Sequence, residues 1–398
     1  MPAIHSRIFS YFEFVSGIAF LSVFESDSKI VQAEFMSEDT NEAPGAPNVP
    51  SGPTAGPNVT LEEIARAAGV SPSTVSRILN GSARVLPEKQ RAVEEAIARF
   101  NYRPNVLARS LASGRTETIG VLTQAVSSPF YAEWLRGIED ALAEPGFTPI
   151  FVSSRWNVVD EKARLEEFIA RRVDGIILLH AQLDEATLAG YSRYAPMLVL
   201  GRSVQNGMTL AGLPIDNLQG ARDATRHLIE QGHREIAFIA GPSSHEDAIE
   251  RLDGYRIALE EAGIGFDADL VEQGDYLETG GLAAMERLMA RRPMFTAVFC
   301  ANDQTAYGAR LAMFRRGVRV PEDVSLVGFD DLPTSSYMTP PLTTVRQPTY
   351  EIGRLAAQGI VQMIRKQPVA LSPIPLTLVT RETTRRIGAS LSPGDEHR

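Results

Sequence analysis

The sequence is poor in cysteine, because its 398 residues include only Cys300. A lone cysteine excludes an intrachain disulfide and any metal site that needs several cysteines. Cys300 lies in an apolar stretch, which favours an inert core position over a reactive thiol. A chain without disulfides is typical of a reducing compartment, and we expect a cytoplasmic protein.

The sequence also lacks the common catalytic motifs. It has no G-x-S-x-G nucleophile elbow, no G-x-x-x-x-G-K-S/T phosphate loop, no H-E-x-x-H zinc motif and no glycine fingerprint after an expected strand. His227 and His233 flank an expected helix end, a placement more typical of structural residues than of metal ligands. We therefore expect no enzymatic activity, no cofactor and no metal.

A clear membrane-spanning run is missing as well. The candidate, Ile8–Phe24, is short for a span and contains Glu13. A signal or membrane segment is one interpretation of this run, but we favour an upstream translation start with Met36 as the functional one. Residues 37–58 are acidic and rich in Pro, Gly and Ala, a composition that cannot build a core. We expect residues 1–57 to be a disordered leader or a mis-assigned start, without membrane contact.

Positive charge is scarce overall, with a net charge of −10, but one segment concentrates it. Residues 58–116 carry nine Arg and Lys against five Asp and Glu, whereas residues 1–57 and 117–398 are both acidic. A chain of this length with 44% hydrophobic residues can form two or three domains. A basic module on an acidic body is typical of a DNA-binding head attached to a regulatory domain.

The basic segment begins with a helix-turn-helix pattern. Thr60 and Glu63 form a capping box that starts a helix, and Gly69 ends it. Ser71 can cap a second helix, which has Pro72 at its first position. A helical hairpin from any small bundle is the alternative, since two helices alone do not imply DNA binding.

The second helix presents a set of side chains suited to base edges and phosphates. They are short hydrogen-bonding residues and one arginine, namely Ser73, Thr74, Ser76, Arg77 and Asn80. The helix Ser71–Asn80 is therefore the predicted reading helix of a helix-turn-helix.

The order of the following motifs resembles one known family. A third helix is expected from Pro87, and the pattern V-T-x-x-x-I-A-x-x-A-G-V-S-x-x-T-V-S-R-x-L-N-G is followed by N-Y-R-P-N-x-L-A-R-S-L. Together they resemble the lactose/galactose repressor (LacI/GalR) family of transcriptional regulators, from about residue 58 to about residue 386. The resemblance implies a head over residues 58–103 and a hinge over residues 104–116.

The resemblance also implies how DNA is bound. Residues 105–113 would form a hinge helix that enters the minor groove when two copies meet, with Leu111 wedged between base pairs; an ordinary linker is the alternative. Two meeting hinges imply a homodimer or tetramer on double-stranded DNA with a palindromic operator. The implied DNA-binding residues are Thr60, Ser71, Pro72, Ser73, Thr74, Ser76, Arg77, Asn80, Tyr102, Asn105, Ala108, Arg109 and Leu111.

The rest of the chain alternates short apolar strands with amphipathic helices, such as Phe130–Leu142 and Glu161–Arg171. This alternation predicts an α/β body of parallel sheets. In the resembling family the body has two lobes like a periplasmic binding protein, here residues 117–218 plus 346–372 and residues 219–345 plus 373–386, before a disordered tail over 387–398. The expected strands are Thr118–Thr123, Pro149–Ser153, Gly175–His180 and Met197–Leu200, then Glu235–Ala240, Ala297–Ala301 and Val324–Phe329, with Leu342–Pro348 and a final strand near Pro375–Thr383 crossing between lobes.

Ligands of parallel sheets bind beyond the carboxyl ends of the strands, which places a cleft between the lobes. A sugar needs polar groups for its hydroxyls and an aromatic platform for its C–H faces. Structural alternatives remain for several candidates: Arg251 as an ion pair, Asn302 as a helix cap and Asp330 as a turn residue. The candidates that match strand ends and the effector positions of the family are Ser127, Phe130, His245, Asp247, Arg251, Tyr276, Asn302 and Asp330.

The sequence therefore predicts a dimeric, sugar-responsive transcriptional repressor. A solute-binding protein of a sugar transporter shares the two-lobed body, but it needs a secretory leader and no helix-turn-helix. An enzyme with its active site in the cleft is a third possibility. This sequence lacks the phosphate-binding glycines that such an enzyme needs, and an enzyme would not explain the helix-turn-helix head. The segment Asp247–Tyr255 is closer to the galactose-repressor branch than to the purine one, which favours a hexose or glycoside effector.

Overall fold

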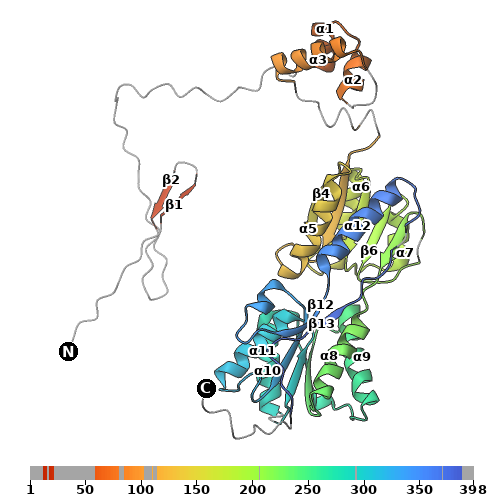
Figure 1. Ribbon diagram of the computed structural model, residues 1–398. Helices are drawn as coiled ribbons and strands as arrows, with labels where there is room; N and C mark the ends of the chain where they lie inside the picture. Colours follow the sequence, from red (N-terminus) through yellow and green to blue (C-terminus); the bar gives the residue numbers. More distant parts are fainter. Residues whose placement is uncertain are drawn as a thin grey trace, which may run out of the picture. The chain divides into compact units, whose positions relative to one another are not determined.

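The structure is a computed structural model that forms two compact units, Met1–Tyr102 and Arg103–Arg398 (Figure 1). The residues described are 59–79, 85–102, 110, 114–205, 207–291, 294–369 and 371–387, together with the backbone of 12–15 and 18–21.

The first unit contains the predicted helix-turn-helix, made of α1 (Leu61–Ala67), α2 (Pro72–Leu79) and α3 (Pro87–Phe100). The capping box is present, since the Glu63 N–H donates to Thr60 Oγ1 over 3.3 Å and the Thr60 N–H donates to Glu63 Oε2 over 2.8 Å. The helices enclose a small core of Ile64, Ala65, Val75, Val93 and Ala96.

Two short strands, β1 (Phe12–Val15) and β2 (Ile18–Leu21), pair antiparallel within the apolar run near the start of the chain. At these positions the structure differs from the predicted disordered leader. The physical reason is local: both segments are rich in aromatic and branched apolar residues, which favour strands. Among the described residues, no helix has both the length and the apolar character to cross a membrane.

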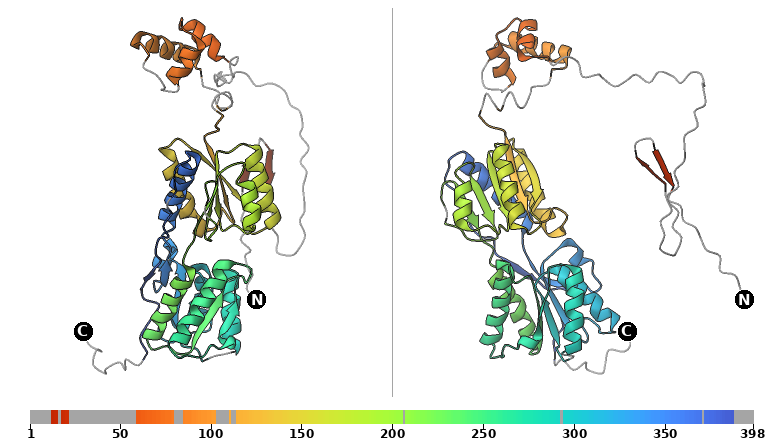
Figure 2. Two further views of the ribbon diagram at one scale, coloured as in Figure 1. Left: turned by 90° about the vertical axis from the view of Figure 1, so that its right-hand side faces the viewer. Right: turned by 180° about the vertical axis from the view of Figure 1, so that it is seen from behind.

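The N-terminal lobe of the second unit is a five-stranded parallel sheet in the order β4-β3-β5-β6-β7. Helices cover both of its faces (Figure 2). α5 and α12 share one core with the sheet, while residues of α6 and α7 contribute to the core on its other face. The elements are β3 (Thr118–Thr123), α5 (Pro129–Ala143), β4 (Thr148–Ser153), α6 (Val158–Ala170), β5 (Gly175–Leu179), α7 (Glu185–Tyr191), β6 (Met197–Leu200), β7 (Leu210–Leu213) and the late helix α12 (Thr349–Ile364).

The C-terminal lobe is a six-stranded sheet in the order β13-β12-β11-β10-β8-β9, parallel except for β13. α10 and α11 lie on one side of it and α8 and α9 on the other (Figure 1). The elements are α8 (Asn217–Glu230), β8 (Ile236–Ala240), α9 (Glu246–Glu261), η1 (Ala268–Leu270), β9 (Val271–Gln273), α10 (Glu278–Arg291), β10 (Ala297–Cys300), α11 (Asp303–Arg315), β11 (Ser325–Asp330), η2 (Pro333–Ser336), β12 (Thr343–Arg346) and β13 (Thr377–Val379).

The predicted strands of the body are all present, and most of their ends shift by no more than one residue. The last strand is shorter than predicted, since β13 covers only Thr377–Val379 of the expected Pro375–Thr383. Two strands were not predicted: β7 is only four apolar residues long and β9 is a three-residue edge strand, so neither shows a clear period. The boundary between the lobes lies slightly earlier than predicted, because α8 begins at Asn217 and its core residues pack in the C-terminal lobe.

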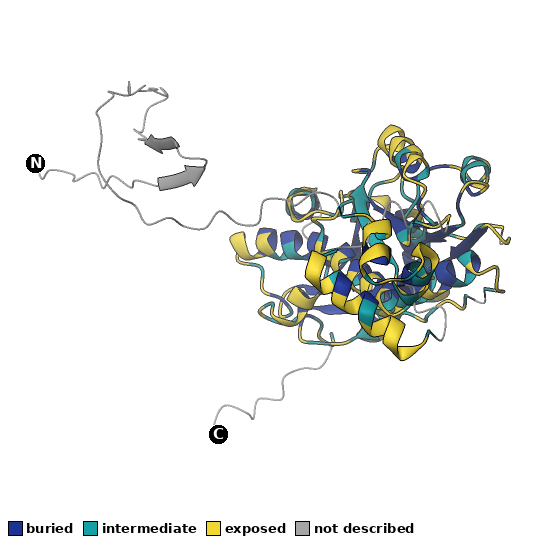
Figure 3. Cartoon of the chain, turned by 90° about the horizontal axis from the view of Figure 1, so that it is seen from above, coloured by how far each residue is buried: buried dark blue, intermediate teal, exposed yellow. Residues whose placement is uncertain are grey.

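Burial follows the layers, with the strands buried and the outer helix faces exposed (Figure 3). Cys300 is fully buried, and burial raises the pKa of its thiol, which confirms the inert core position. The ring nitrogens of His233 contact Thr296 Oγ1 over 2.9 Å and the Arg385 carbonyl over 3.2 Å. His227 Nε2 lies 3.0 Å from Thr384 Oγ1, so both histidines are structural, as predicted.

α12 returns from the C-terminal lobe to the N-terminal lobe and packs closely against α5. Two glycines permit this approach. A Cβ on Gly137 would lie 2.1 Å from the Tyr350 carbonyl oxygen, and a Cβ on Gly353 would lie 2.3 Å from the Trp134 carbonyl oxygen. Backbone therefore meets backbone where the two helices cross, and this contact ties the late helix to the first helix of the lobe.

We predict that Gly137→Ala lowers the free energy of unfolding of the body by about 1–3 kcal/mol, because the new methyl group must push α12 away. Chemical denaturation followed by circular dichroism measures the change. Gly190→Ala is the matched control: Gly190 lies in α7 with nothing within 4 Å of its added Cβ, so this change should be neutral or stabilising. Equal stability of the two variants would contradict the close α5–α12 contact.

Candidate functional site

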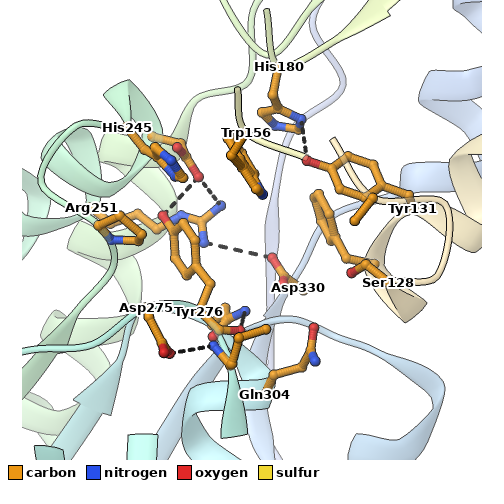
Figure 4. Close-up of a pocket in the computed structure, with 16 residues that line it drawn as sticks. Ser128, Tyr131, Trp156, His180, His245, Arg251, Asp275, Tyr276, Gln304 and Asp330 are labelled. Atoms are coloured by element: carbon orange, nitrogen blue, oxygen red, sulfur yellow. Dashed lines mark hydrogen bonds and ion pairs between the residues drawn. The ribbon is translucent and has the colours of Figure 1, made fainter. Parts of the chain in front are cut away.

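A cavity of about 270 Å³ lies where strands of both lobes end. Its walls carry aromatic rings and charged groups (Figure 4). The residues that line it are Ala125, Ser128, Phe130, Tyr131, Trp156, His180, Pro242, His245, Asp247, Arg251, Asp275, Tyr276, Leu277, Asn302, Gln304 and Asp330.

The structure brings together most of the residues predicted for this site. Seven of the eight predicted residues line the cavity: Phe130, His245, Asp247, Arg251, Tyr276, Asn302 and Asp330. The exception is Ser127, which is exposed and lies outside the lining, while its neighbour Ser128 lies within it. The sequence thus predicted correctly that this turn contributes to the cavity, but it predicted the wrong serine.

Arg251 is the most constrained side chain of the site, and only 2% of it is exposed. Its Nε and Nη2 donate to Asn217 Oδ1 over 3.1 and 3.0 Å, and its Nη1 donates to the Ala301 carbonyl over 2.6 Å. The guanidinium carbon also lies 4.0 Å from the centre of the Phe329 ring. Most of the guanidinium is thus held by the protein itself. Arg251 therefore fits a structural role as well as a role in ligand binding.

Two carboxylates flank the guanidinium. Asp247 Oδ2 lies 3.6 Å from Arg251 Nη2, and Asp330 Oδ1 lies 3.8 Å from Arg251 Nη1. Burial alone would raise the pKa of Asp247, but Arg251 and neighbouring groups hold it below its usual value. Burial raises the pKa of Asp330, and Arg251 offsets part of this effect. The site therefore presents one firmly ionised carboxylate and one carboxyl that takes up a proton more readily.

Tyr276 and Asn302 are held by contacts inside the C-terminal lobe. Tyr276 donates its hydroxyl to Asp247 Oδ2 over 2.8 Å, and Asn302 Nδ2 donates to the Tyr276 carbonyl over 3.0 Å. Asn302 also accepts from the Thr305 N–H over 3.0 Å, so it is the N-cap of α11. Asn302 is thus a helix cap that also lines the cavity.

The N-terminal lobe contributes an aromatic wall. Phe130, Tyr131 and Trp134 on α5 surround the imidazole of His180, with ring centres 5.8 to 5.9 Å from it. Burial lowers the pKa of His180 to about 4, so the ring is neutral near pH 7. Tyr131 Oη lies 3.4 Å from His180 Nδ1. An apolar wall with a few polar atoms suits the C–H face of a sugar ring.

Trp156 lies in the wall of the cavity and meets the other lobe. Its indole follows the end of β4 and stacks on His245, which precedes α9, with 3.9 Å between ring centres and 18° between ring planes (Figure 4). The two lobes therefore touch through a pair of flat rings. Burial lowers the pKa of His245, which keeps this ring neutral as well.

Sequence reasoning missed Trp156 and His180, although both follow strands that it did predict. Both have a positive backbone φ, of 58° and 56°, as do Tyr276 at 68° and Asp330 at 116°. Non-glycine residues rarely adopt such angles, and they cluster at binding sites. Their position just after predicted strands could have identified Trp156 and His180 as candidates. Their φ angles could not, because a sequence does not show them.

Behind the cavity, Asp303 supports the loop that follows β11. Its carboxylate accepts from Thr344 Oγ1 and Ser335 Oγ, both over 2.5 Å, and from the Leu332 N–H over 2.8 Å. The side chain is fully buried, and burial raises its pKa to about 7. Asp303 thus positions the segment next to Asp330 without lining the cavity.

In the head, the predicted reading helix is α2, and its side chains are open to solvent. Ser71, Pro72, Ser73 and Arg77 are exposed, while Thr74 and Ser76 are half-buried. Ser71 caps the helix, since its Oγ accepts from the Thr74 N–H over 3.3 Å.

The remaining predicted DNA-binding residues divide into two groups. Thr60 is exposed but committed to the capping box, and Tyr102 packs against the core of the head. Asn80, Asn105, Ala108, Arg109 and Leu111, with nearly all of the predicted hinge helix, lie outside the described residues.

The head and body each match a known family description. Residues 60–105 match "Bacterial regulatory proteins, lacI family", and residues 225–384 match "Periplasmic binding protein-like domain". A helix-turn-helix head on a two-lobed ligand-binding body defines the class of DNA-binding regulators.

Relatives along most of the chain agree with this class. Catabolite control protein A of Priestia megaterium is 35% identical over 82% of this chain and 100% of its own length. The regulator CelR of Thermobifida fusca is 38% identical over 83% of this chain and 98% of its own. The ribose operon repressor of Escherichia coli is 36% identical over 81% of this chain and 98% of its own.

Solved structures agree as well. The Lac repressor dimer bound to operator and the anti-inducer ONPF has a TM-score of 0.75 at 31% identity, covering 83% of this chain and all of that one. The complex of CelR with cellobiose has a TM-score of 0.62 at 37% identity, covering 82% of this chain and 99% of that one. The chain belongs to the LacI family of transcriptional regulators, which confirms the predicted fold class and a regulator rather than an enzyme.

We predict that Asp303 makes a contribution to the stability of the C-terminal lobe that is lost as the pH rises from about 4 to about 7. The unfolded Asp303 carboxyl titrates near about 3.9, whereas burial raises its folded pKa to about 7. In this window the folded state binds a proton that the unfolded state releases, so its contribution to the free energy of unfolding falls with rising pH. Asp303→Asn stays neutral and should remove this contribution, so its free energy of unfolding should fall less, or rise more, with pH across the window than that of the wild type, as measured by urea unfolding.

Asp323→Asn is the matched control for that experiment. Asp323 is a surface carboxylate whose hydrogen bonds with Arg319 lower its pKa to about 2. Its contribution is lost only as the pH falls below about 4, so this variant should keep the wild-type slope in the window. A wild-type slope in Asp303→Asn as well would contradict the raised pKa.

Proposed function

We propose that this chain is a homodimeric or tetrameric transcriptional repressor that binds a palindromic operator and is controlled by a sugar or glycoside in the cleft between its lobes. The observation that carries the proposal is the combination of an exposed reading helix with a cavity that pairs an aromatic wall with ionised groups. Because such a repressor acts on operator DNA, we also infer a cytoplasmic location.

The polar groups of the cavity suit a polyhydroxylated ligand. Asp247 and Asp330 can accept hydrogen bonds from sugar hydroxyls, and Gln304 offers an amide. The rings of Phe130 and Tyr276 offer flat apolar faces. The related CelR structure is a complex with cellobiose, and that of a LacI family regulator from Enterococcus faecium has bound ribose, which supports the same ligand class here.

The connections between the lobes can couple ligand binding to the angle between the lobes. Asn217, which holds Arg251, is the first residue of α8 and follows directly on the chain's first crossing. Gln347, which donates to Asp330 Oδ1 over 2.7 Å, lies on the crossing between β12 and α12. A ligand that binds these groups can favour one lobe angle by its differential affinity, typically about 1–3 kcal/mol.

A solute-binding protein of a sugar transporter was the alternative function that the sequence left open. It shares the two-lobed body, and the cavity by itself suits either role. The head argues against it, because a transport protein has no use for a helix-turn-helix.

We predict that Arg77→Ala weakens binding to the preferred operator by about 1–3 kcal/mol, because an exposed arginine of the reading helix is lost. Gel retardation on an inverted repeat selected from random DNA measures this cost. Arg91→Ala removes an exposed arginine of α3 instead and should cost less on the operator. Equal losses in the two variants would show that α2 does not read the DNA.

We also predict that Arg251→Lys reduces the sensitivity of operator binding to sugar at least tenfold while leaving sugar-free binding near normal. Lysine keeps the charge but lacks the planar fork that Asn217 and the carboxylates require. Retardation assays with increasing sugar measure the response. Arg251→Ala is a poorer test, because it would leave the buried carboxyl groups of Asp247 and Asp330 without their cationic partner.

Arg256→Lys is the matched control for the sugar response. Arg256 lies on the same helix, is exposed and pairs with Asp253 over 3.3 Å outside the cavity. This variant should respond like the wild type. A wild-type response in Arg251→Lys would mean that Arg251 is structural only.

A further inference from the structure

A second cavity of about 490 Å³ adjoins the first. The two share four residues of their walls, Trp156, His180, His245 and Asp247. The second cavity adds polar side chains of its own, among them Gln182, Arg202, Ser244 and Glu246. The cleft is thus larger than the first cavity alone. We call the first and second cavities its first and second chambers.

The stacked rings of Trp156 and His245 form part of the wall between the chambers. Both rings line both cavities, and they come from opposite lobes. At 3.9 Å between ring centres nothing fits between them. A ligand that extends from one chamber into the other at this point must therefore separate the rings, and so widen the angle between the lobes.

The second chamber contains polar groups that the protein leaves unsatisfied. Arg202 Nε and His245 Nδ1 are buried and have no hydrogen-bond partner among the described residues. Buried polar atoms are nearly always paired, so a hydroxyl group that reached these nitrogens as the rings separate would satisfy them. The Nη1 of Arg202 donates to the Leu183 carbonyl over 3.0 Å, which fixes the guanidinium in place.

The charges of the second chamber favour a neutral ligand over an anionic one. Arg202 is its single cation among the lining residues, against the carboxylates of Glu246 and Asp247. Burial lowers the pKa of both His180 and His245, so neither adds a positive charge near pH 7. A phosphate would meet more negative than positive charge, whereas hydroxyl groups would find both donors and acceptors.

Size also points to a ligand with two rings. Small-molecule sites span roughly 300–1,000 Å³, and the first chamber, at about 270 Å³, lies just below this range. The chamber suits one sugar ring, and the two chambers together fall well inside the range for a larger ligand.

We propose that the cleft binds a neutral two-ring glycoside, such as a disaccharide, with one ring in each chamber and its linkage between Trp156 and His245. This inference rests on the proposed sugar response and adds a second subsite to it. The indole face then contacts the C–H face of the sugar in place of the imidazole. A monosaccharide fills the first chamber alone and leaves the ring pair closed.

The first test compares disaccharides with their own monosaccharides on the full chain. Isothermal titration with cellobiose, maltose and lactose, and with glucose and galactose, should show at least one disaccharide binding at least tenfold tighter than its constituents. That disaccharide should change the fluorescence of Trp156, and the change should vanish in Trp156→Phe. Monosaccharides that bind as tightly as every disaccharide would overturn the two-chamber site.

The second test blocks the added chamber. Ser244 is exposed and lines only the second cavity, so Ser244→Trp should fill that chamber and reduce disaccharide affinity to the level of the monosaccharide. Ser243→Trp is the matched control, since this exposed neighbour lines neither cavity, and it should bind both sugars as the wild type does. Unchanged disaccharide affinity in Ser244→Trp would overturn the second subsite.

The two proposals fail in different ways. If monosaccharides bind and control operator release while disaccharides gain nothing, the sugar-responsive function stands and the second subsite is wrong. If no sugar of either kind binds, the sugar response itself is wrong, and the second subsite falls with it.

Discussion

The buried guanidinium of Arg251 is the constraint on which the ligand-binding body depends. A charge that is 2% exposed must be paired and hydrogen-bonded, since an unpaired buried ion costs several kcal/mol or more. Its partners come from separate parts of the chain: Asn217 at the start of α8, Asp247 on α9, the Ala301 carbonyl after β10, and Asp330 at the end of β11. Satisfying one side chain thus holds the strand ends of the C-terminal lobe in one arrangement.

The same network gives the cavity its chemical character and its link to movement. Because Asn217 and Gln347 stand beside the connections between the lobes, the polar groups that can meet a ligand are bonded to the segments that any change of lobe angle must bend. The N-terminal lobe contributes mainly flat rings, and Trp156 carries one of them across to His245. One lobe thus supplies most of the charge and the other most of the aromatic surface, so a sugar gains its full set of contacts only between them.

Sequence reasoning succeeded where the signal was local. The capping box of Thr60 and Glu63 marks the first helix of the head because its atoms lie three residues apart. The strands of the body were found because buried parallel strands are short apolar runs between turns. Asp247 and Asp330 were placed in the cavity by the rule that strand ends meet at one edge of a sheet, and by family resemblance. The strand Phe12–Val15 was missed because the apolar run around it was interpreted as sequence upstream of a functional start at Met36.

By itself the sequence determined the helix-turn-helix, the alternation of strands and helices, and the family, since each depends on residue types at short, fixed spacings. Only the tertiary structure decided that Ser128 rather than Ser127 faces the cavity, that Asn302 is both a cap and part of a wall, and that Trp156 meets His245. These outcomes depend on φ angles, on the twist of two sheets and on the distance between two lobes. Such quantities are set by the packing of the whole chain, because a side chain's neighbours in space are seldom its neighbours in sequence.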